Sequence, residues 1–181
     1  NLVTLSWNAL SQIRNAPYQA CTAAQDIMHA IEKHNNAAFQ DELSKIDFSI
    51  AISSGYAYCG NIGTQTLRSF SVIGNVHAKC SALLAMNEMY NIKCSIEGTI
   101  LPAAIKEYNV KPICVLVVSK ENGKNDDEQF DSYELVIKNK KKGDGEWMYE
   151  LDRETEAQAW TELQESYQMC KQGNIAEAMQ K

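Results

Sequence analysis

The sequence is short of basic residues and of long apolar runs, and both shortages exclude classes of protein. Lys and Arg number 17 against 23 Asp and Glu, so the net charge at pH 7 is −6. This balance argues against a protein that binds nucleic acid through its phosphates, although a local basic patch is still compatible with it. No apolar stretch approaches the roughly 20 residues of a membrane helix, and no signal peptide is recognisable. We therefore expect an intracellular domain with no membrane contact of its own.

Metal-type cysteine spacing is absent as well. The chain has six cysteines, and no two of them form a C-x-x-C pair. They lie in apolar segments, which is typical of reduced core thiols in an intracellular protein. A redox or metal site has no spacing to support it. The cysteines are Cys21, Cys59, Cys80, Cys94, Cys114 and Cys170.

The 181 residues, 45% of them apolar, are enough for one globular domain with a buried core. The hydrophobic period changes several times along the chain, which predicts an α+β or α/β class with a mixed sheet. Helical spacing is found in residues 17–34, 76–84, 99–108 and 154–170. Strand-like patterns are found in residues 2–7, 48–53, 67–73, 92–96, 112–118, 133–138 and 147–151.

Several local features are specific enough to be checked. The run 112–118 is the best candidate for a fully buried strand, and Gly60–Gly63 is expected to form a hairpin turn. Gly173 is expected to stop the helix that precedes it. The helix that begins near Val76 is expected to bury Val76, Cys80, Leu83 and Leu84.

Residues Phe48–Leu84 carry a pattern that resembles the central block of class III nucleotidyl cyclase domains. Residues 52–63 read ISSGYAYCGNIG, and residues 68–83 read RSFSVIGNVHAKCSAL. In that family the corresponding segments are a strand ending in H-x-G, a G-x-x-G, a Y-[DT]-x-x-G-[DN] and a helix with V-N-x-A-x-R. The order and spacing agree without a gap. Segments 2–31, the hairpin around Lys138 and the tail 159–180 also resemble elements of the family.

The resemblance implies an α+β fold, with a ferredoxin-like mixed sheet and helices packed on it. It implies a cyclase-homology domain over residues 1–152, whose first strand and helices are expected to precede Asn1. A C-terminal helical extension is expected over residues 153–181.

The family's reaction is an in-line attack of the ribose 3′ oxygen on the α-phosphorus, assisted by two metal ions that two aspartates hold. The resemblance places Asn1 at one metal aspartate, Ala78 at the transition-state asparagine and Ala82 at the transition-state arginine. An arginine that some partner subunits contribute falls on Ser49. An amide is a poor magnesium ligand, and a methyl group offers neither charge nor donor. The catalytic positions are therefore predicted to be degenerate.

The nucleotide contacts implied by the resemblance are better preserved. Ser71 stands at the base-reading position, with Ile73 two residues on, and Lys140 is expected to contact phosphate, or Lys138 with a register slip. The lysines from 140 to 142 are equally typical of a solvated hairpin tip. His77 is more typical of a solvated or capping histidine than of a phosphate ligand.

These substitutions predict a catalytically degenerate cyclase-like domain that acts as a dimerisation, scaffold or regulatory module, in the setting of cAMP signalling. One alternative is a subunit of an active heterodimeric adenylate or guanylate cyclase, a phosphorus-oxygen lyase. Another is a sensor that binds ATP or GTP without turnover. The expected partner is a second cyclase-type domain, identical or different. No cofactor is expected, and Mg²⁺ or Mn²⁺ with ATP or GTP is required only if the domain is active.

Overall fold

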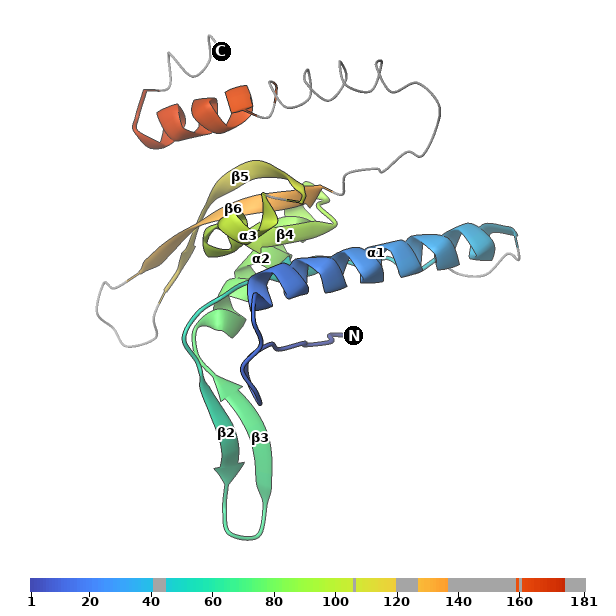
Figure 1. The fold of residues 1–181 in the computed structure, drawn as a ribbon, viewed down its shortest axis with the longest axis vertical. Coiled ribbons are helices and arrows are strands. Elements are labelled where there is room, and N and C mark those ends of the chain that lie inside the picture. The colour runs from blue at the N-terminus through green and yellow to red at the C-terminus, as the bar shows by residue number, and fades with distance from the viewer. Residues whose placement is uncertain (41–44, 106, 120–126, 137–158, 160, 175–181) are drawn as a thin grey trace.

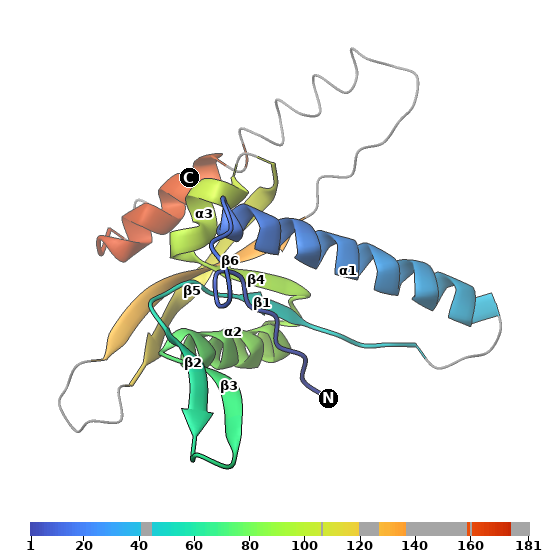
Figure 2. The ribbon, with the colours of Figure 1, turned by 60° about the horizontal axis from the view of Figure 1, so that its bottom comes forward.

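The computed structural model describes residues 1–40, 45–105, 107–119, 127–136, 159 and 161–174. A mixed sheet lies between helix α1 on one face and helix α2 on the other, and a two-stranded hairpin projects away from this body (Figures 1 and 2). Among the described residues, no helix has the length and apolar character needed to span a bilayer. The elements are α1 (Ala16–Gln40), β1 (Ile50–Ile52), β2 (Tyr58–Gly63), β3 (Arg68–Ile73), α2 (Val76–Tyr90), β4 (Cys94–Glu97), a 3-10 turn (Gly98–Ile100), α3 (Leu101–Ala104), β5 (Asn109–Val118) and β6 (Glu128–Val136).

The main sheet has the strand order β1-β4-β6-β5. Strands β1 and β4 are parallel and are joined through α2, whereas β4 pairs antiparallel with β6 and β6 with β5. This arrangement confirms the predicted α+β class with a mixed sheet. All four residues of β4 are buried, because it is covered on both faces and flanked on both sides.

The prediction that residues 112–118 form a strand is confirmed, but the prediction that this strand is buried is wrong. Strand β5 lies at the edge of the sheet, and Val115 and Val117 on it are 40% and 51% exposed. Its register shifts between Pro112 and Cys114. Proline is tolerated at an edge strand because no hydrogen-bond partner needs its missing N–H.

As predicted, successive side chains around residue 50 face opposite sides of the sheet, and they pack into two separate cores. Phe48, Ile50 and Ile52 pack on the cluster that α1, β4 and β6 share. Ala51 points the other way and packs on the cluster of Leu83, Met86, Ile92 and Phe130 beneath α2. Successive strand residues face opposite sides, so one short strand closes both cores.

The N-terminal strand predicted for residues 2–7 is not formed. Leu2, Val3 and Leu5 are 78%, 81% and 56% exposed, and the segment has no regular structure. A strand needs a neighbour for its backbone N–H and C=O groups, and no described strand pairs with this segment. Helix α1 follows and ends at Gln40, later than the predicted His34.

Two other elements differ in extent from the prediction. Gly60–Gly63 lies within β2, and the chain reverses at Thr64–Leu67, where the Thr64 N–H donates to the Leu67 carbonyl over 2.8 Å. The helix predicted over 99–108 is reduced to a 3-10 turn and the four residues of α3.

The six cysteines are free, as predicted, but only part of the set lies in the core. Cys21 and Cys94 are buried, and Cys80 and Cys114 are half-buried. Burial raises the pKa of the Cys21 thiol to about 11 and keeps it protonated. Cys59 and Cys170 are exposed, so the prediction of core thiols is wrong for these two.

Residues 161–171 are helical, and the helix stops where the sequence predicted. Gly173 adopts a φ of 89°, and its N–H donates to the Cys170 carbonyl while that of Asn174 donates to Met169. This is the Schellman arrangement, which favours glycine because a left-handed residue is required. The boundary predicted between 152 and 153 lies outside the described residues.

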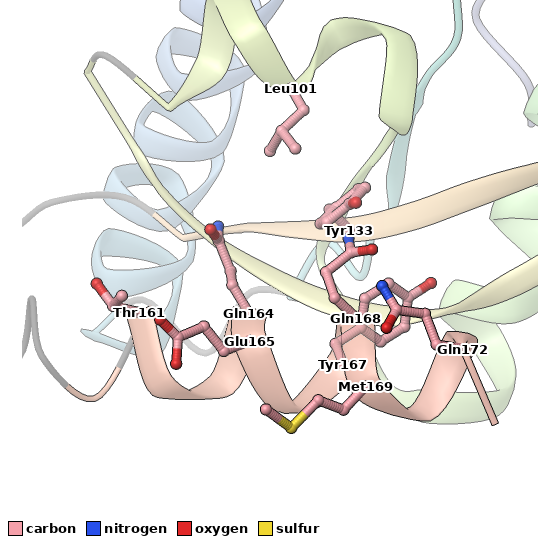
Figure 3. Close-up of a pocket in the computed structure, with 9 residues that line it drawn as sticks. All are labelled: Leu101, Tyr133, Thr161, Gln164, Glu165, Tyr167, Gln168, Met169 and Gln172. Carbon is pink, nitrogen blue, oxygen red and sulfur yellow. The ribbon is translucent and has the colours of Figure 1, made fainter. Parts of the chain in front are cut away.

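One acidic residue of β6, Asp131, contacts this C-terminal helix through its carboxylate. Lys171 Nζ lies 2.7 Å from both carboxylate oxygens of Asp131, and the Tyr167 hydroxyl is 3.3 Å from Oδ1. The Tyr133 and Tyr167 rings meet edge to face at 6.2 Å. Burial, and then the Asp131 charge, raise the pKa of Tyr167. Figure 3 shows the cavity of about 420 Å³ that remains between this helix, Leu101 and Tyr133.

We predict that Asp131→Asn loosens the C-terminal helix without unfolding the sheet. The loss of the charged acceptor is expected to cost about 1 kcal/mol locally. Amides of residues 163–173 should then exchange with deuterium about fivefold faster, while those of α2 stay unchanged. Glu162→Gln, an exposed change on the same helix, is the matched control. Equal acceleration in both variants, or in α2, contradicts the prediction.

Candidate functional site

The base of the β2–β3 hairpin is where the chain passes from the sheet to α2. One leg leaves β1 through Ser53 and Ser54, and the other returns through Gly74 and Asn75 to the start of α2. The two legs lie so close together that a Cβ added to Gly74 would be 2.6 Å from the Tyr56 carbonyl oxygen. Glycine is therefore required at position 74 by the space available.

A buried cluster of charges lies at this base, which we call the Lys79 cluster: Lys79, Glu97 and Glu128. Lys79 Nζ is 2.7 Å from Glu97 Oε1 and 2.8 Å from Glu128 Oε1. The side chains of Lys79 and Glu97 are 6% and 1% exposed, and that of Glu128 is 29% exposed. Lys79 also lies 5.6 Å from the centre of the Phe130 ring. The cluster joins α2, β4 and β6.

The charges of the cluster depend on one another. Burial alone would lower the pKa of Lys79, but hydrogen bonds to Glu128 and Glu97, together with their charges, outweigh it and raise that pKa. The ammonium form is therefore kept at neutral pH. Two carboxylates brought together in a buried place would repel each other without this cation.

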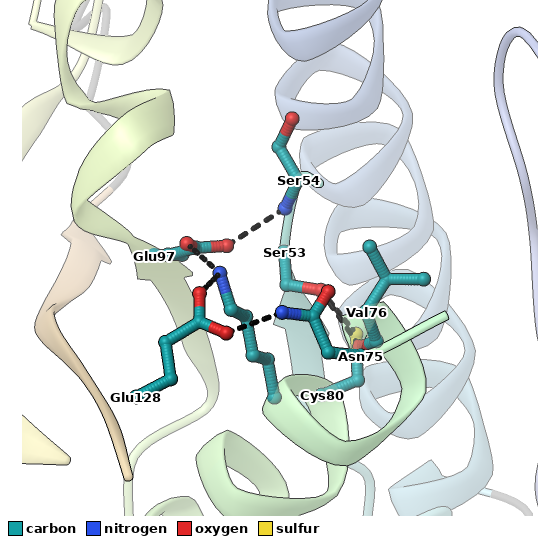
Figure 4. A network of polar contacts seen from close by, with 8 residues as sticks. Ser53, Ser54, Asn75, Val76, Cys80, Glu97 and Glu128 are labelled. Carbon is teal, nitrogen blue, oxygen red and sulfur yellow. Dashed lines mark hydrogen bonds and ion pairs between the residues drawn. The ribbon is translucent and has the colours of Figure 1, made fainter. Parts of the chain in front are cut away.

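Both legs of the hairpin are bonded to the carboxylates of the cluster (Figure 4). The Ser54 N–H donates to Glu97 Oε2 over 2.8 Å, and the Asn75 side-chain amide donates to Glu128 Oε2. Ser53 Oγ donates to the Val76 carbonyl over 2.9 Å, which joins the first leg to α2. The base is thus fixed to the sheet through acidic side chains and to α2 through the backbone.

Two of the predicted nucleotide contacts lie on β3, and two of the positions predicted to be degenerate lie on α2. Ser71 is half-buried opposite Gly60, and Ile73 is 53% exposed opposite Tyr58. Ala78 is exposed on the first turns of α2. Ala82 is half-buried and packs on the Leu83 core cluster. The two alanines therefore do not form one open helix face.

The remaining predicted positions are scattered. Asn1 is exposed in the irregular N-terminal segment, and Ser49 is exposed before β1, where its hydroxyl is 3.3 Å from the Asn87 amide. Lys138 and Lys140 lie outside the described residues. His77 is exposed, and its Nε2 is 3.1 Å from the Val72 carbonyl on β3.

The described residues do not form a divalent-metal site. No group of three or more His, Cys, Asp or Glu side chains among them is arranged to hold an ion. The two carboxylates that do converge, Glu97 and Glu128, are already neutralised in part by Lys79. The donor set of this region therefore fits an ammonium and not Mg²⁺.

Sequence reasoning missed Lys79, Asn87 and Glu97, and each is buried. The observed buried face of α2 is Lys79, Leu83, Met86 and Asn87, so Leu83 was predicted correctly and the polar members were not. The burial of Lys79 was detectable in the sequence, because Lys79 lies three residues after Val76 and four before Leu83 and therefore on the apolar face of the helix.

Comparison with known proteins identifies the fold. No family model and no curated protein matches the sequence. The crystal structure of the adenylyl cyclase CyaB from P. aeruginosa matches 76% of this chain and 68% of its own, with a TM-score of 0.50 and 16% identity. This likeness confirms, at the level of the fold, the cyclase resemblance predicted from residues 48–84.

Two further solved structures are similar at lower TM-scores. The guanylyl cyclase Cya2 matches 74% of this chain at 16% identity and a TM-score of 0.46. A bacterial light-regulated adenylyl cyclase matches 46% of it at 12% identity and a TM-score of 0.36. The match spans 65% of the Cya2 chain and 22% of the light-regulated one.

We predict that Lys79→Met destabilises the fold by about 3 to 5 kcal/mol, because it leaves Glu97 buried without a cation. Replacing both partners, as in Lys79→Met with Glu97→Leu, should recover most of this loss, since no buried charge is left unpaired. The measurement is the free energy of unfolding in urea.

The control for this comparison is Lys93→Met. Lys93 pairs with Asp47 over 2.8 Å, but both side chains are exposed, so little change is expected. Equal losses in Lys79→Met and Lys93→Met would show that burial of the Lys79 cluster has no energetic weight.

Proposed function

We propose that this chain is a catalytically degenerate domain of the nucleotidyl cyclase fold that acts as a dimerisation and regulatory module. Its partner is a second cyclase-type domain, either another copy or an active cyclase. The observation that carries the proposal is the set of exposed apolar side chains that share one face of the β2–β3 hairpin.

One face of the hairpin carries three exposed apolar side chains, which alternate with glycine and serine residues. Tyr58 and Ile73 are directly opposite each other across the two strands, and Ile62 follows on the same face. These side chains are 85%, 53% and 45% exposed. A two-stranded hairpin is marginal by itself, and an exposed apolar face of this kind is typical of an interaction surface. Tyrosine and isoleucine would become buried there on association.

The lack of catalysis follows from the residues that replace the family's groups. Ala78 presents a methyl group where the resemblance expects a donor, and Ala82 is half-buried against the Leu83 core cluster. The loss of one preorganised donor typically lowers a rate by about 100- to 1,000-fold. Lys79, the basic residue beside Ala78, is already held by two carboxylates and is not free to bind phosphate.

We predict that Tyr58→Ser with Ile73→Ser weakens self-association at least about tenfold, because buried aromatic and aliphatic anchors dominate such interfaces. Analytical ultracentrifugation over a concentration series measures the dissociation constant. Met89→Ser, at a residue 76% exposed on the far end of α2, is the matched control. A protein that neither self-associates nor binds an active cyclase domain refutes the dimerisation role.

We also predict no cyclic nucleotide production with ATP or GTP and Mg²⁺ or Mn²⁺, in an assay sensitive enough to detect residual turnover. Cyclic nucleotide production that Ser71→Ala abolishes would contradict the predicted lack of catalysis. Calorimetry with ATP and GTP then separates a scaffold from a nucleotide sensor. Saturable heat that Ser71→Ala reduces would replace the scaffold role by the sensor role.

A further inference from the structure

The Lys79 cluster fixes two separate parts of the chain that lead into the projecting hairpin. We infer that the cluster sets the direction in which the β2–β3 hairpin points, and that Lys79 is the positioning residue for the hairpin surface. This inference rests on the proposed function only for its effect on association, because the direction of the hairpin is measurable in a single protomer.

The hairpin has little else to hold it against the sheet. Strands β2 and β3 pair with each other over the six residues of each, and among the described residues their main-chain pairing is with no other strand. Five of the six residues of β2 are exposed. Figures 1 and 2 show the hairpin extending away from the sheet and the helices in both views. Its direction therefore depends on the contacts at its base.

The base contacts are of two kinds. His77 to Val72 and Ser53 to Val76 join the legs to the first turn of α2. Ser54 to Glu97 and Asn75 to Glu128 join the legs to β4 and β6. The contacts to α2 alone would leave the hairpin free to tilt about the start of that helix. The second kind fixes that tilt, because it ties each leg to a different strand.

Both sheet contacts depend on the same cation. Lys79 Nζ bonds one oxygen of Glu97 and one of Glu128, which leaves the other oxygen of each to accept from Ser54 and Asn75. Without Lys79, Glu97 would be a buried anion beside a second anion, and the two carboxylates would repel each other and move apart. Both legs would then lose their partners together, although neither leg was changed.

The experiment measures the distance between spin labels on the hairpin and on the body. Cys59 on β2 is exposed and lies on the hairpin face opposite to Tyr58, so a label there leaves the proposed interface clear. The second label is placed at Glu88→Cys on α2, an exposed position, in a Cys170→Ser background. Labelled protein is diluted with unlabelled protein, so that only distances within one protomer are recorded.

The variant tested is Lys79→Met with Glu97→Leu, which removes the tether to Ser54 and leaves no buried charge unpaired. The inference expects a broader distance distribution than in the parent, with the thermal unfolding midpoint nearly kept. Lys93→Met, which breaks the exposed pair with Asp47, is expected to leave the distribution unchanged. Asn75→Ala alone, which removes only the second tether, should broaden it to a smaller extent.

An unchanged distribution in the folded double variant overturns the inference. Equal broadening in Lys93→Met overturns it as well. If one protomer in ten keeps the competent direction, the dissociation constant of a homodimer, which needs two competent protomers, should rise about 100-fold. A broader distribution with unchanged association leaves the positioning role of the Lys79 cluster established and refutes the hairpin as the interface, so the two failures are distinguishable.

Discussion

The constraint on which this structure depends is the burial of one lysine between two carboxylates. A charge in the interior is tolerated only when it is paired and hydrogen-bonded, and Lys79 meets both conditions with Glu97 and Glu128. These three residues come from α2, β4 and β6, which are far apart in the sequence and adjacent in space. These ion pairs therefore fix the position of α2 on the sheet more specifically than apolar contacts do, because their hydrogen bonds require a direction and a distance.

The two cores explain why the fold tolerates buried charged residues on one side of the sheet. The cluster around Cys94, Ile96, Tyr133 and Leu135 fills the side under α1, and the smaller one around Leu83 and Met86 fills the side under α2. Most of the large apolar side chains are on the α1 side. The α2 side is smaller and accommodates Lys79 and Asn87 among its buried residues. The α1 face of the sheet thus buries most of the apolar area that stabilises the fold, and the α2 face provides the polar contacts that fix its geometry.

Much of the fold was predictable where a single period or a single residue determines the local structure. The alternation at 48–52, the start of α2 at Val76 and the stop at Gly173 are of this kind. The features that could not be predicted depend on neighbours: β5 has the composition of a buried strand but lies at an edge, and residues 2–7 have a strand pattern but no strand to pair with. Lys79 was missed because its partners lie 18 and 49 positions further on, beyond the reach of any local pattern.

The same region bears on the proposed lack of cyclase activity. A phosphate group needs a cation or an N–H donor that is not already engaged. On the first two turns of α2, Ala78 has no donor, Lys79 is engaged twice, and His77 is bonded to the Val72 carbonyl. The polar groups of this segment thus serve the hairpin base. Two carboxylates against one ammonium also leave the cluster with a net negative charge, which repels a nucleotide's phosphates. The proposed function therefore gives the first turns of α2 the role of holding the hairpin base, in place of the donors that the resemblance expects there.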